Sequence, residues 1–128
     1  MKENPRVFVS DGMDGLARRA GRDLLAPLRV AADCRVWPQA RPPAPEDLRE
    51  ALAEAEGVLC LLTDILDAEL LAGCPDLRVI SSISVGVDHI DLDAATARGI
   101  VVGNTPGVLT ETTADLAFAL LLAAGRRV

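Results

Sequence analysis

One short loop combines the residue types that can bind a small anion. The segment Ser84–His89 (SVGVDH) follows an apolar run and contains one glycine. A glycine allows the backbone to approach a ligand closely, and backbone amides near Val85 and Gly86 can then bind a carboxylate. The alternative is an ordinary connection between a strand and a helix, and the spacing of these residues alone does not decide between the two.

His89 is the only histidine in the chain and the only side chain of this loop that titrates near neutral pH. No serine or cysteine pattern typical of a nucleophile surrounds it. We therefore expect a structural hydrogen-bonding role for His89 rather than general-base catalysis. The aspartates Asp88, Asp91 and Asp93 surround an expected helix start, where carboxylates usually cap the helix rather than bind a metal. The sequence thus offers no catalytic residue and no metal site.

The three cysteines, Cys34, Cys60 and Cys74, are odd in number and widely spaced, which excludes a disulfide framework and argues against zinc. Cys60 lies in an apolar run without a cation nearby, so we expect an inert core residue. Residues 1–6 lack the apolar region and cleavage site of a signal peptide. No apolar stretch approaches the ~20 residues of a membrane span. We expect a cytoplasmic protein without a membrane partner.

The elements that position the loop alternate between short apolar strands and helices. Strands are expected over 6–10, 30–37, 58–62, 77–80 and 100–102. Helices are expected over 14–25, 67–72, 91–98 and 110–127, and between Pro45 and Gly57. This pattern predicts an α/β fold: a flavodoxin-like, doubly wound parallel five-stranded sheet in the order 2-1-3-4-5, with a long C-terminal helix. In such sheets the ligand binds at the carboxyl ends of the strands.

Proline and glycine set several of the expected boundaries. We expect Pro27 to end the first helix, and the prolines between Trp37 and Pro45 to form a surface connection. Gly57 is expected to close the second helix. Gly99 is expected at a left-handed cap position after the helix over 91–98.

Length, charge and composition exclude several classes of protein. A chain of 128 residues forms one domain of ordinary size, and its net charge of −6 disfavours nucleic acid as a partner. Lys2 is the only lysine, which excludes a phosphoreceiver with its lysine after the fifth strand. Almost no aromatic residues are available to stack a flavin. No Gly-x-Gly-x-x-Gly or Walker motif is present, so no nucleotide phosphate site is recognisable.

The expected last helix is apolar on every face, because residues 116–124 are consecutive apolar residues. A helix of this kind must be buried on all sides. We therefore expect it either to fold back onto the sheet or to pair with a second copy in a homodimer.

Two segments of the chain resemble the D-isomer-specific 2-hydroxyacid dehydrogenases, and in particular their glyoxylate/hydroxypyruvate reductase branch. The resemblance is carried by the Ser-Val-Gly-Val-Asp-His loop, the Asn-Thr-Pro turn and the Thr-x-Thr-Thr-Ala-Asp helix start. These motifs lie in the expected order within residues 77–91 and 98–115, and residues 59–64 (LCLLTD) also fit.

The resemblance implies which part of such an enzyme the chain represents. Family members have a flavodoxin-like substrate domain and a Rossmann nucleotide domain. Residues 1–109 then correspond to the substrate-binding lobe and residues 110–128 to the interdomain-type helix, and the Rossmann lobe is absent from this chain. Val85 and Gly86 match the loop whose backbone binds the substrate carboxylate. Leu62 lies at the substrate-facing end of its strand, and Thr113 matches a residue that contacts the dinucleotide.

In the family, a hydride passes from NADH or NADPH to glyoxylate or hydroxypyruvate. His89 does not match the catalytic histidine, and the catalytic arginine, glutamate and histidine have no counterpart here. We therefore expect this chain alone to be inactive, to bind no cofactor tightly and to bind a small 2-keto or 2-hydroxy acid weakly at best. The alternative function is a stand-alone flavodoxin-like structural or interaction module that self-associates through its C-terminal helix.

Overall fold

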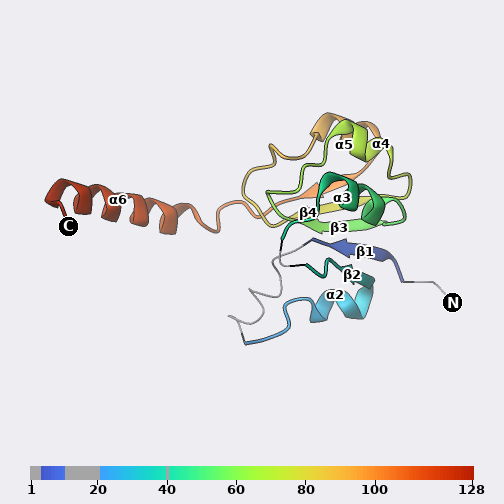
Figure 1. Cartoon of the computed structure of the whole chain (residues 1–128), viewed down its shortest axis with the longest axis horizontal. Helices are drawn as coiled ribbons and strands as arrows, with labels where there is room; N and C mark the ends of the chain where they lie inside the picture. The colour runs from blue at the N-terminus through green and yellow to red at the C-terminus, as the bar shows by residue number, and fades with distance from the viewer. Residues whose placement is uncertain (1–3, 11–20, 40) are drawn as a thin grey trace.

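The computed structural model describes residues 4–10, 21–39 and 41–128. All five strands are parallel and form one sheet in the order β2-β1-β3-β4-β5 (Figure 1). The strands are β1 (Arg6–Val9), β2 (Asp33–Val36), β3 (Gly57–Cys60), β4 (Val79–Ser82) and β5 (Val101–Gly103). The helices are α2 (Ala26–Ala31), α3 (Pro45–Leu52), α4 (Ala68–Ala72), α5 (Leu92–Ala97) and α6 (Thr110–Arg126). The predicted flavodoxin-like fold class and strand order are confirmed.

The helices cover the two faces of the sheet unequally. Figure 1 shows α3, α4 and α5 on one face and α2 on the other. The larger hydrophobic core lies on the first face, where Phe8, Leu52, Leu71 and Ile80 are fully buried. The second core is small, with Val9 and Leu25 as its buried members. Among the described residues, α2 covers only part of this second face of the sheet.

The uncovered part of the sheet forms an apolar groove of about 480 Å³ between α2 and strands β1, β3 and β4. Leu28 and Leu59 are among the residues that line it. Val79, which also lines the groove, pairs in register with Val101 of β5. These two side chains are 46% and 65% exposed, respectively.

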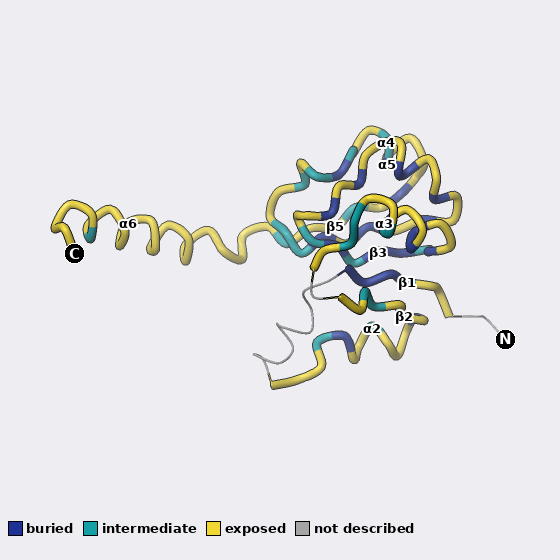
Figure 2. Tube along the Cα trace, viewed as in Figure 1, coloured by how far each residue is buried: buried dark blue, intermediate teal, exposed yellow. Residues whose placement is uncertain are grey.

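Helix α6 projects away from the domain, and Figure 2 shows it exposed along its length. Of its residues only Ala123 is partly covered. In this structure α6 does not fold back onto the sheet. Its pairing with a second copy stays a prediction. In the described part of the chain, no helix is long and apolar enough to cross a membrane.

The predicted boundary at Pro27 is wrong. Pro27 lies in the first turn of α2 instead of ending a helix, and Val30, assigned to a strand, belongs to α2 and is largely exposed. Strand β2 accordingly begins at Asp33. The reason is that proline is tolerated in the first turn of a helix as readily as after its end. Of the helix predicted over 14–25, residues 14–20 lie outside the described residues, and residues 21–25 contain turns but no helix.

Other boundaries shift as well, while the caps predicted at Gly99 and Asp91 are confirmed. Gly57 does not close α3 but opens β3, where it pairs with Val7 and Val79. Strand β4 begins at Val79 and continues through Ser82. Gly99 has a φ of +69°, as the left-handed cap requires. The Asp91 carboxylate accepts a hydrogen bond from the Ala94 amide at 2.9 Å and caps α5.

The proline-rich connection between β2 and α3 contains the only tryptophan. The indole Nε1 of Trp37 donates a hydrogen bond to the carbonyl of Arg41 at 2.8 Å. The Arg41 guanidinium lies 5.9 Å from the centroid of the same ring, within the range of a cation–π contact. The ring also packs against the larger hydrophobic core. Trp37 therefore anchors the start of this connection to the core.

Candidate functional site

The candidate site lies where the carboxyl ends of the parallel strands meet at one edge of the sheet. The loop after β4 is bound there to the connection after β5. The backbone amide and the hydroxyl of Thr105 both donate to the carbonyl of Ser84, at 2.8 and 3.1 Å. The side-chain amide of Asn104 donates to the carbonyl of Val85 at 2.7 Å. Two consecutive loop carbonyls are therefore held by two consecutive residues.

The third carbonyl of the loop is held from within the loop itself. The Ser84 hydroxyl donates to the carbonyl of Gly86 at 2.7 Å. By contrast, the amides of Val85, Gly86 and Val87 donate to no group among the described residues. Val85 is 44% exposed and Gly86 is also exposed. The loop thus presents backbone donors without acceptors, which is what a bound carboxylate requires.

Ser82 connects this loop to His89. The Ser82 hydroxyl is buried and lies 2.6 Å from the Ser84 hydroxyl and 2.9 Å from Nε2 of His89. Because the Ser84 proton is directed at Gly86, Ser82 donates to Ser84 and accepts the hydrogen bond from Nε2–H of His89. Nε2 of His89 therefore has no free lone pair with which to act as a base in this arrangement.

The other two residues expected at the site, Leu62 and Thr113, form none of the hydrogen bonds that hold this loop. Leu62 follows β3, which pairs with β4, and its side chain is 65% exposed. Strand β3 ends at Cys60, earlier than the expected boundary at Leu62. Thr113 lies in the first turn of α6, outside the body of the domain, and its amide donates to the carbonyl of Leu109. The roles of Leu62, Val85, Gly86 and Thr113 stay predictions.

Sequence reasoning missed a buried carboxylate at the same edge. Oδ2 of Asp64 accepts hydrogen bonds from the Ser10 hydroxyl at 2.5 Å and from the Leu61 amide at 2.8 Å. Oδ1 of Asp64 is buried without a partner among the described residues. Ser10 directly follows β1, and Asp64 lies four residues after the end of β3. Polar residues just after apolar strands were the signal that could have identified this pair.

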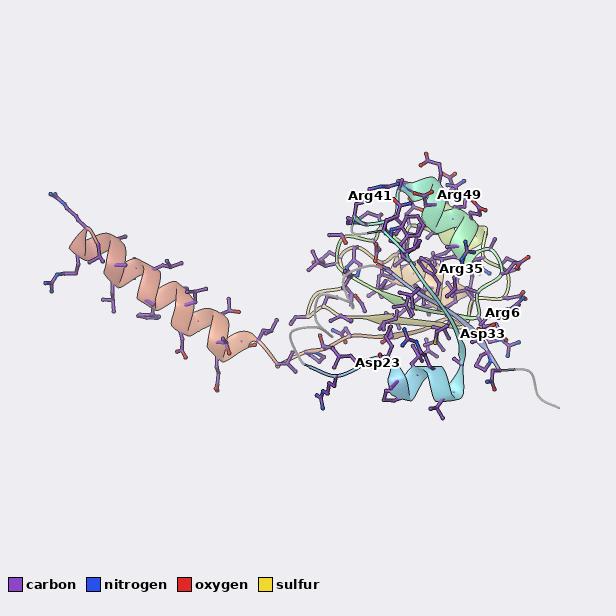
Figure 3. All side chains as sticks on the ribbon, turned by 60° about the horizontal axis from the view of Figure 1, so that its bottom comes forward. Arg6, Asp23, Asp33, Arg35, Arg41 and Arg49 are labelled. Carbon is purple, nitrogen blue, oxygen red and sulfur yellow. The ribbon has the colours of Figure 1, made fainter. Side chains whose placement is uncertain are left out.

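A negatively charged side chain lies beside the loop. Oδ2 of Asp88 lies 3.3 Å from the position that a Cβ on Gly86 would occupy. Arg41 and Arg49, on the side of the domain that carries α3 (Figure 3), are in exposed ion pairs with Asp47 and Glu69. None of the hydrogen bonds described for the loop comes from an arginine.

The Cys60 thiol, at the end of β3, provides no reactive nucleophile at this edge. Burial raises the pKa of the Cys60 thiol to about 11, although the nearby Ser82 hydroxyl acts in the opposite direction. The thiol is therefore protonated and inert near neutral pH. No group of three or more histidine, cysteine or acidic residues placed to hold a metal ion occurs among residues 4–10, 21–39 and 41–128.

The sequence matches a protein family over most of its length. A model of the D-isomer specific 2-hydroxyacid dehydrogenase catalytic domain matches residues 15–124. The match includes the loop after β4 and the connection that holds it. It therefore covers the residues that form the candidate site.

Individual relatives agree with this match. The glyoxylate reductase/hydroxypyruvate reductase of Mus musculus is 51% identical over 126 residues, which are 96% of this chain and 36% of that protein. The glyoxylate reductase of Korarchaeum cryptofilum is 44% identical over 124 residues, which are 97% of this chain and 35% of that protein. The chain thus spans about a third of the length of the curated relatives it matches.

A solved structure extends the comparison to three dimensions. The D-lactate dehydrogenase of Aquifex aeolicus, crystallised with NAD and lactic acid, superposes with a TM-score of 0.68 at 28% identity, covering 92% of this chain and 33% of that one. Sequence and fold lead to the same assignment. The chain belongs to the D-isomer specific 2-hydroxyacid dehydrogenases and corresponds to their catalytic domain.

Proposed function

We propose that this domain binds the carboxylate of a small 2-keto acid, glyoxylate or hydroxypyruvate, that is reduced with NADH or NADPH in a two-lobed enzyme. The observation that carries the proposal is the loop after β4, in which three carbonyls are held and the amides of Val85, Gly86 and Val87 have no partner among the described residues. The names of the relatives support the choice of keto acid.

The residues of this domain would bind and orient the substrate. The Val85 and Gly86 amides donate to the carboxylate, and the exposed side chains of Val85 and Leu62 border the small substrate on its apolar side. Thr113 would contact the dinucleotide from α6. The nicotinamide, when bound, supplies the hydride that adds to the carbonyl carbon of the keto acid.

Nε2 of His89 does not serve as the proton donor for the new hydroxyl group in this arrangement. Its N–H is already directed at Ser82, so this nitrogen holds the loop. We propose that the domain alone binds keto acid weakly, holds NADH or NADPH weakly and has no reductase activity. Glyoxylate-dependent oxidation of NADPH at ordinary enzyme rates would contradict this assignment of roles.

The binding role is tested by an NMR titration of the 15N-labelled chain with oxalate, a stable analogue of glyoxylate. We expect saturable shifts of the Val85 and Gly86 amides at millimolar oxalate. Acetate, which lacks the second oxygen-bearing carbon, serves as the matched control and should bind more weakly. Shifts spread over other surfaces, with none in this loop, would contradict the proposal.

A second candidate function is supported by α6. Its large apolar side chains are mostly solvent-exposed, with Phe118 at 67%. Contiguous apolar surface of this kind usually marks an interaction site. We propose that two copies of the chain associate through α6, which is compatible with substrate binding by the loop at the carboxyl edge of the sheet.

We also propose a cytoplasmic location. The support is that Cys34, Cys60 and Cys74 are all free thiols. Free cysteines persist in the reducing cytoplasm, whereas oxidising compartments favour disulfides.

A further inference from the structure

We propose that Asn104 is a positioning residue for the carboxylate-binding loop. Its side-chain amide fixes the peptide unit between Val85 and Gly86 and so aims the Gly86 amide at the bound carboxylate. The inference rests on the proposed function, because it concerns how the same loop binds the acid. Asn104 itself does not touch the substrate.

The planar peptide unit links the direction of each carbonyl to that of the next N–H. In a trans peptide the carbonyl and the following N–H point in opposite directions. The hydrogen bond of 2.7 Å from Asn104 to the Val85 carbonyl therefore fixes the direction of the Gly86 N–H, which points away from Asn104. The bonds from Thr105 to the Ser84 carbonyl fix the Val85 N–H in the same way.

The hydrogen bonds from Asn104 and Thr105 turn two successive loop carbonyls toward the same side of the chain. In an extended strand, successive carbonyls point to opposite sides of the chain. Here the carbonyls of Ser84 and Val85 are both held by the adjacent residues Asn104 and Thr105, so both point toward the connection after β5. The amides of Val85 and Gly86 must then share the opposite side. Successive amides on one side form an anion-binding concavity.

The hydrogen bonds also make these amides stronger donors. Peptide groups whose carbonyls accept hydrogen bonds are polarised, and chains of such bonds reinforce one another. The Ser84 carbonyl accepts two hydrogen bonds, and the carbonyls of Val85 and Gly86 accept one each. A loop that is held in this way before the ligand arrives loses less conformational freedom on binding.

The domain does not need Asn104 for its core. The side chain is exposed, and its hydrogen bond to Val85 is the one described for it. The Thr105 amide and hydroxyl still hold the Ser84 carbonyl when the carboxamide is removed. We therefore expect Asn104→Ala to fold normally, with an unchanged urea midpoint and unchanged amide shifts within the sheet.

The test is the oxalate titration by NMR, applied to Asn104→Ala and Asn104→Gln. Asn4→Ala is the matched control, because Asn4 is the only other asparagine and is exposed near the N-terminus. We expect the dissociation constant for oxalate to rise roughly fivefold to tenfold in Asn104→Ala, with the largest loss of shift at Gly86. Asn104→Gln keeps a donor and should lie between wild type and Asn104→Ala.

The outcomes separate this inference from the function on which it rests. Saturable loop shifts in wild type with the same dissociation constant in Asn104→Ala would overturn the positioning role and leave the proposed function intact. Equal weakening by Asn4→Ala would also overturn it. No loop shift in wild type would overturn the proposed function and the positioning role together.

Discussion

The Ser10 hydroxyl donates a hydrogen bond of 2.5 Å to Oδ2 of Asp64, and both side chains are buried where β1 and β3 end. This bond joins neighbouring strands beyond the last residues that pair in the sheet. Burial of a carboxylate is costly unless hydrogen bonds compensate for its lost hydration. Ser10 and the Leu61 amide provide that compensation on the Oδ2 side.

Removal of the Ser10 hydroxyl should destabilise the domain. Ser10→Ala leaves the buried Asp64 carboxylate with one donor fewer, at a cost of about 1–3 kcal/mol. Urea unfolding followed by circular dichroism measures the change. Ser81→Ala is the matched control, because Ser81 lies on the exposed side of β4 and should change the free energy of unfolding by less than about 0.5 kcal/mol. Equal stability of the two variants would show that the Asp64 carboxylate does not depend on Ser10.

Gly86→Ala should weaken oxalate binding while leaving the free energy of unfolding nearly unchanged. The added methyl group would lie 3.3 Å from Oδ2 of Asp88, an exposed side chain that can move away. We expect a change of less than about 0.5 kcal/mol in the free energy of unfolding, but clearly weaker oxalate binding because the methyl group narrows the approach to the loop amides. Gly103→Ala, where a Cβ meets nothing within 4 Å, is the control. Unchanged oxalate affinity in Gly86→Ala would place the ligand elsewhere.

The negative charge of Asp88 should repel a bound anion, so its removal should strengthen oxalate binding. Its carboxylate lies beside Gly86 and is exposed, so its effect is screened by water and salt. We expect Asp88→Asn to bind oxalate roughly twofold to threefold more tightly at low ionic strength, with the difference shrinking in 0.5 M salt, as expected for an exposed charge. Glu50→Gln on α3 makes the same change in net charge at a distance. A similar gain from Glu50→Gln would assign the effect to net charge rather than to Asp88.

Cys60 should make the domain sensitive to alkali. Burial raises the pKa of its thiol from 9.0 to about 11, so the folded state keeps a proton that the unfolded state loses. The resulting stability is fully present below pH 9 and is lost as the pH rises toward 11, with a size on the order of 2 kcal/mol. The chain has no tyrosine, so few other groups titrate in this range.

Urea midpoints between pH 8 and pH 11 provide the measurement for Cys60. Cys60→Ala should show a flatter pH dependence than wild type, although its stability at pH 8 is lower because of the cavity. Cys34→Ala is the control, since Cys34 is only partly buried. Parallel curves for wild type and Cys60→Ala would contradict the role of Cys60.

Self-association should depend on the apolar side chains of α6. Sedimentation velocity over a range of concentrations should show a dimer for wild type and a shift toward monomer for Leu120→Glu, because burial of each leucine contributes roughly 1.5–3 kcal/mol. Val30→Glu is the control, as Val30 is an apolar residue on α2 that is even more exposed than Leu120. A wild-type chain that stays monomeric at high concentration would rule out the homodimer.

The central strands could be predicted from the sequence because β1 and β3 are short, largely apolar runs bounded by glycine, proline or charge, whereas β2 contains Asp33 and Arg35 and its start was misplaced. The element boundaries at Pro27 and Gly57 could not. Pro27 is compatible with both the end and the start of a helix, and Gly57 with both a helix end and a strand start. A Cβ on Gly57 would lie 3.3 Å from Cγ2 of Val7, and that close approach between strands exists only in the folded sheet.

The candidate site was predictable only in part. Gly86 and the motif around it identified the loop, because a glycine after a buried strand is a local signal. The contacts of Asn104 and Thr105 with Val85 and Ser84 join residues about twenty positions apart, so they depend on the pairing of β4 with β5. The pairing of Ser10 with Asp64 likewise depends on β1 lying beside β3.

The attachment of Trp37 beside α3 makes this chain convenient for optical measurements. With one tryptophan and no tyrosine, near-ultraviolet emission comes from a single ring whose indole nitrogen is bonded to the Arg41 carbonyl and whose face lies beside the Arg41 guanidinium. Emission therefore reports on the connection between β2 and α3. Fluorescence unfolding curves will therefore report unfolding of the domain. They will not detect dissociation or fraying of the projecting helix α6.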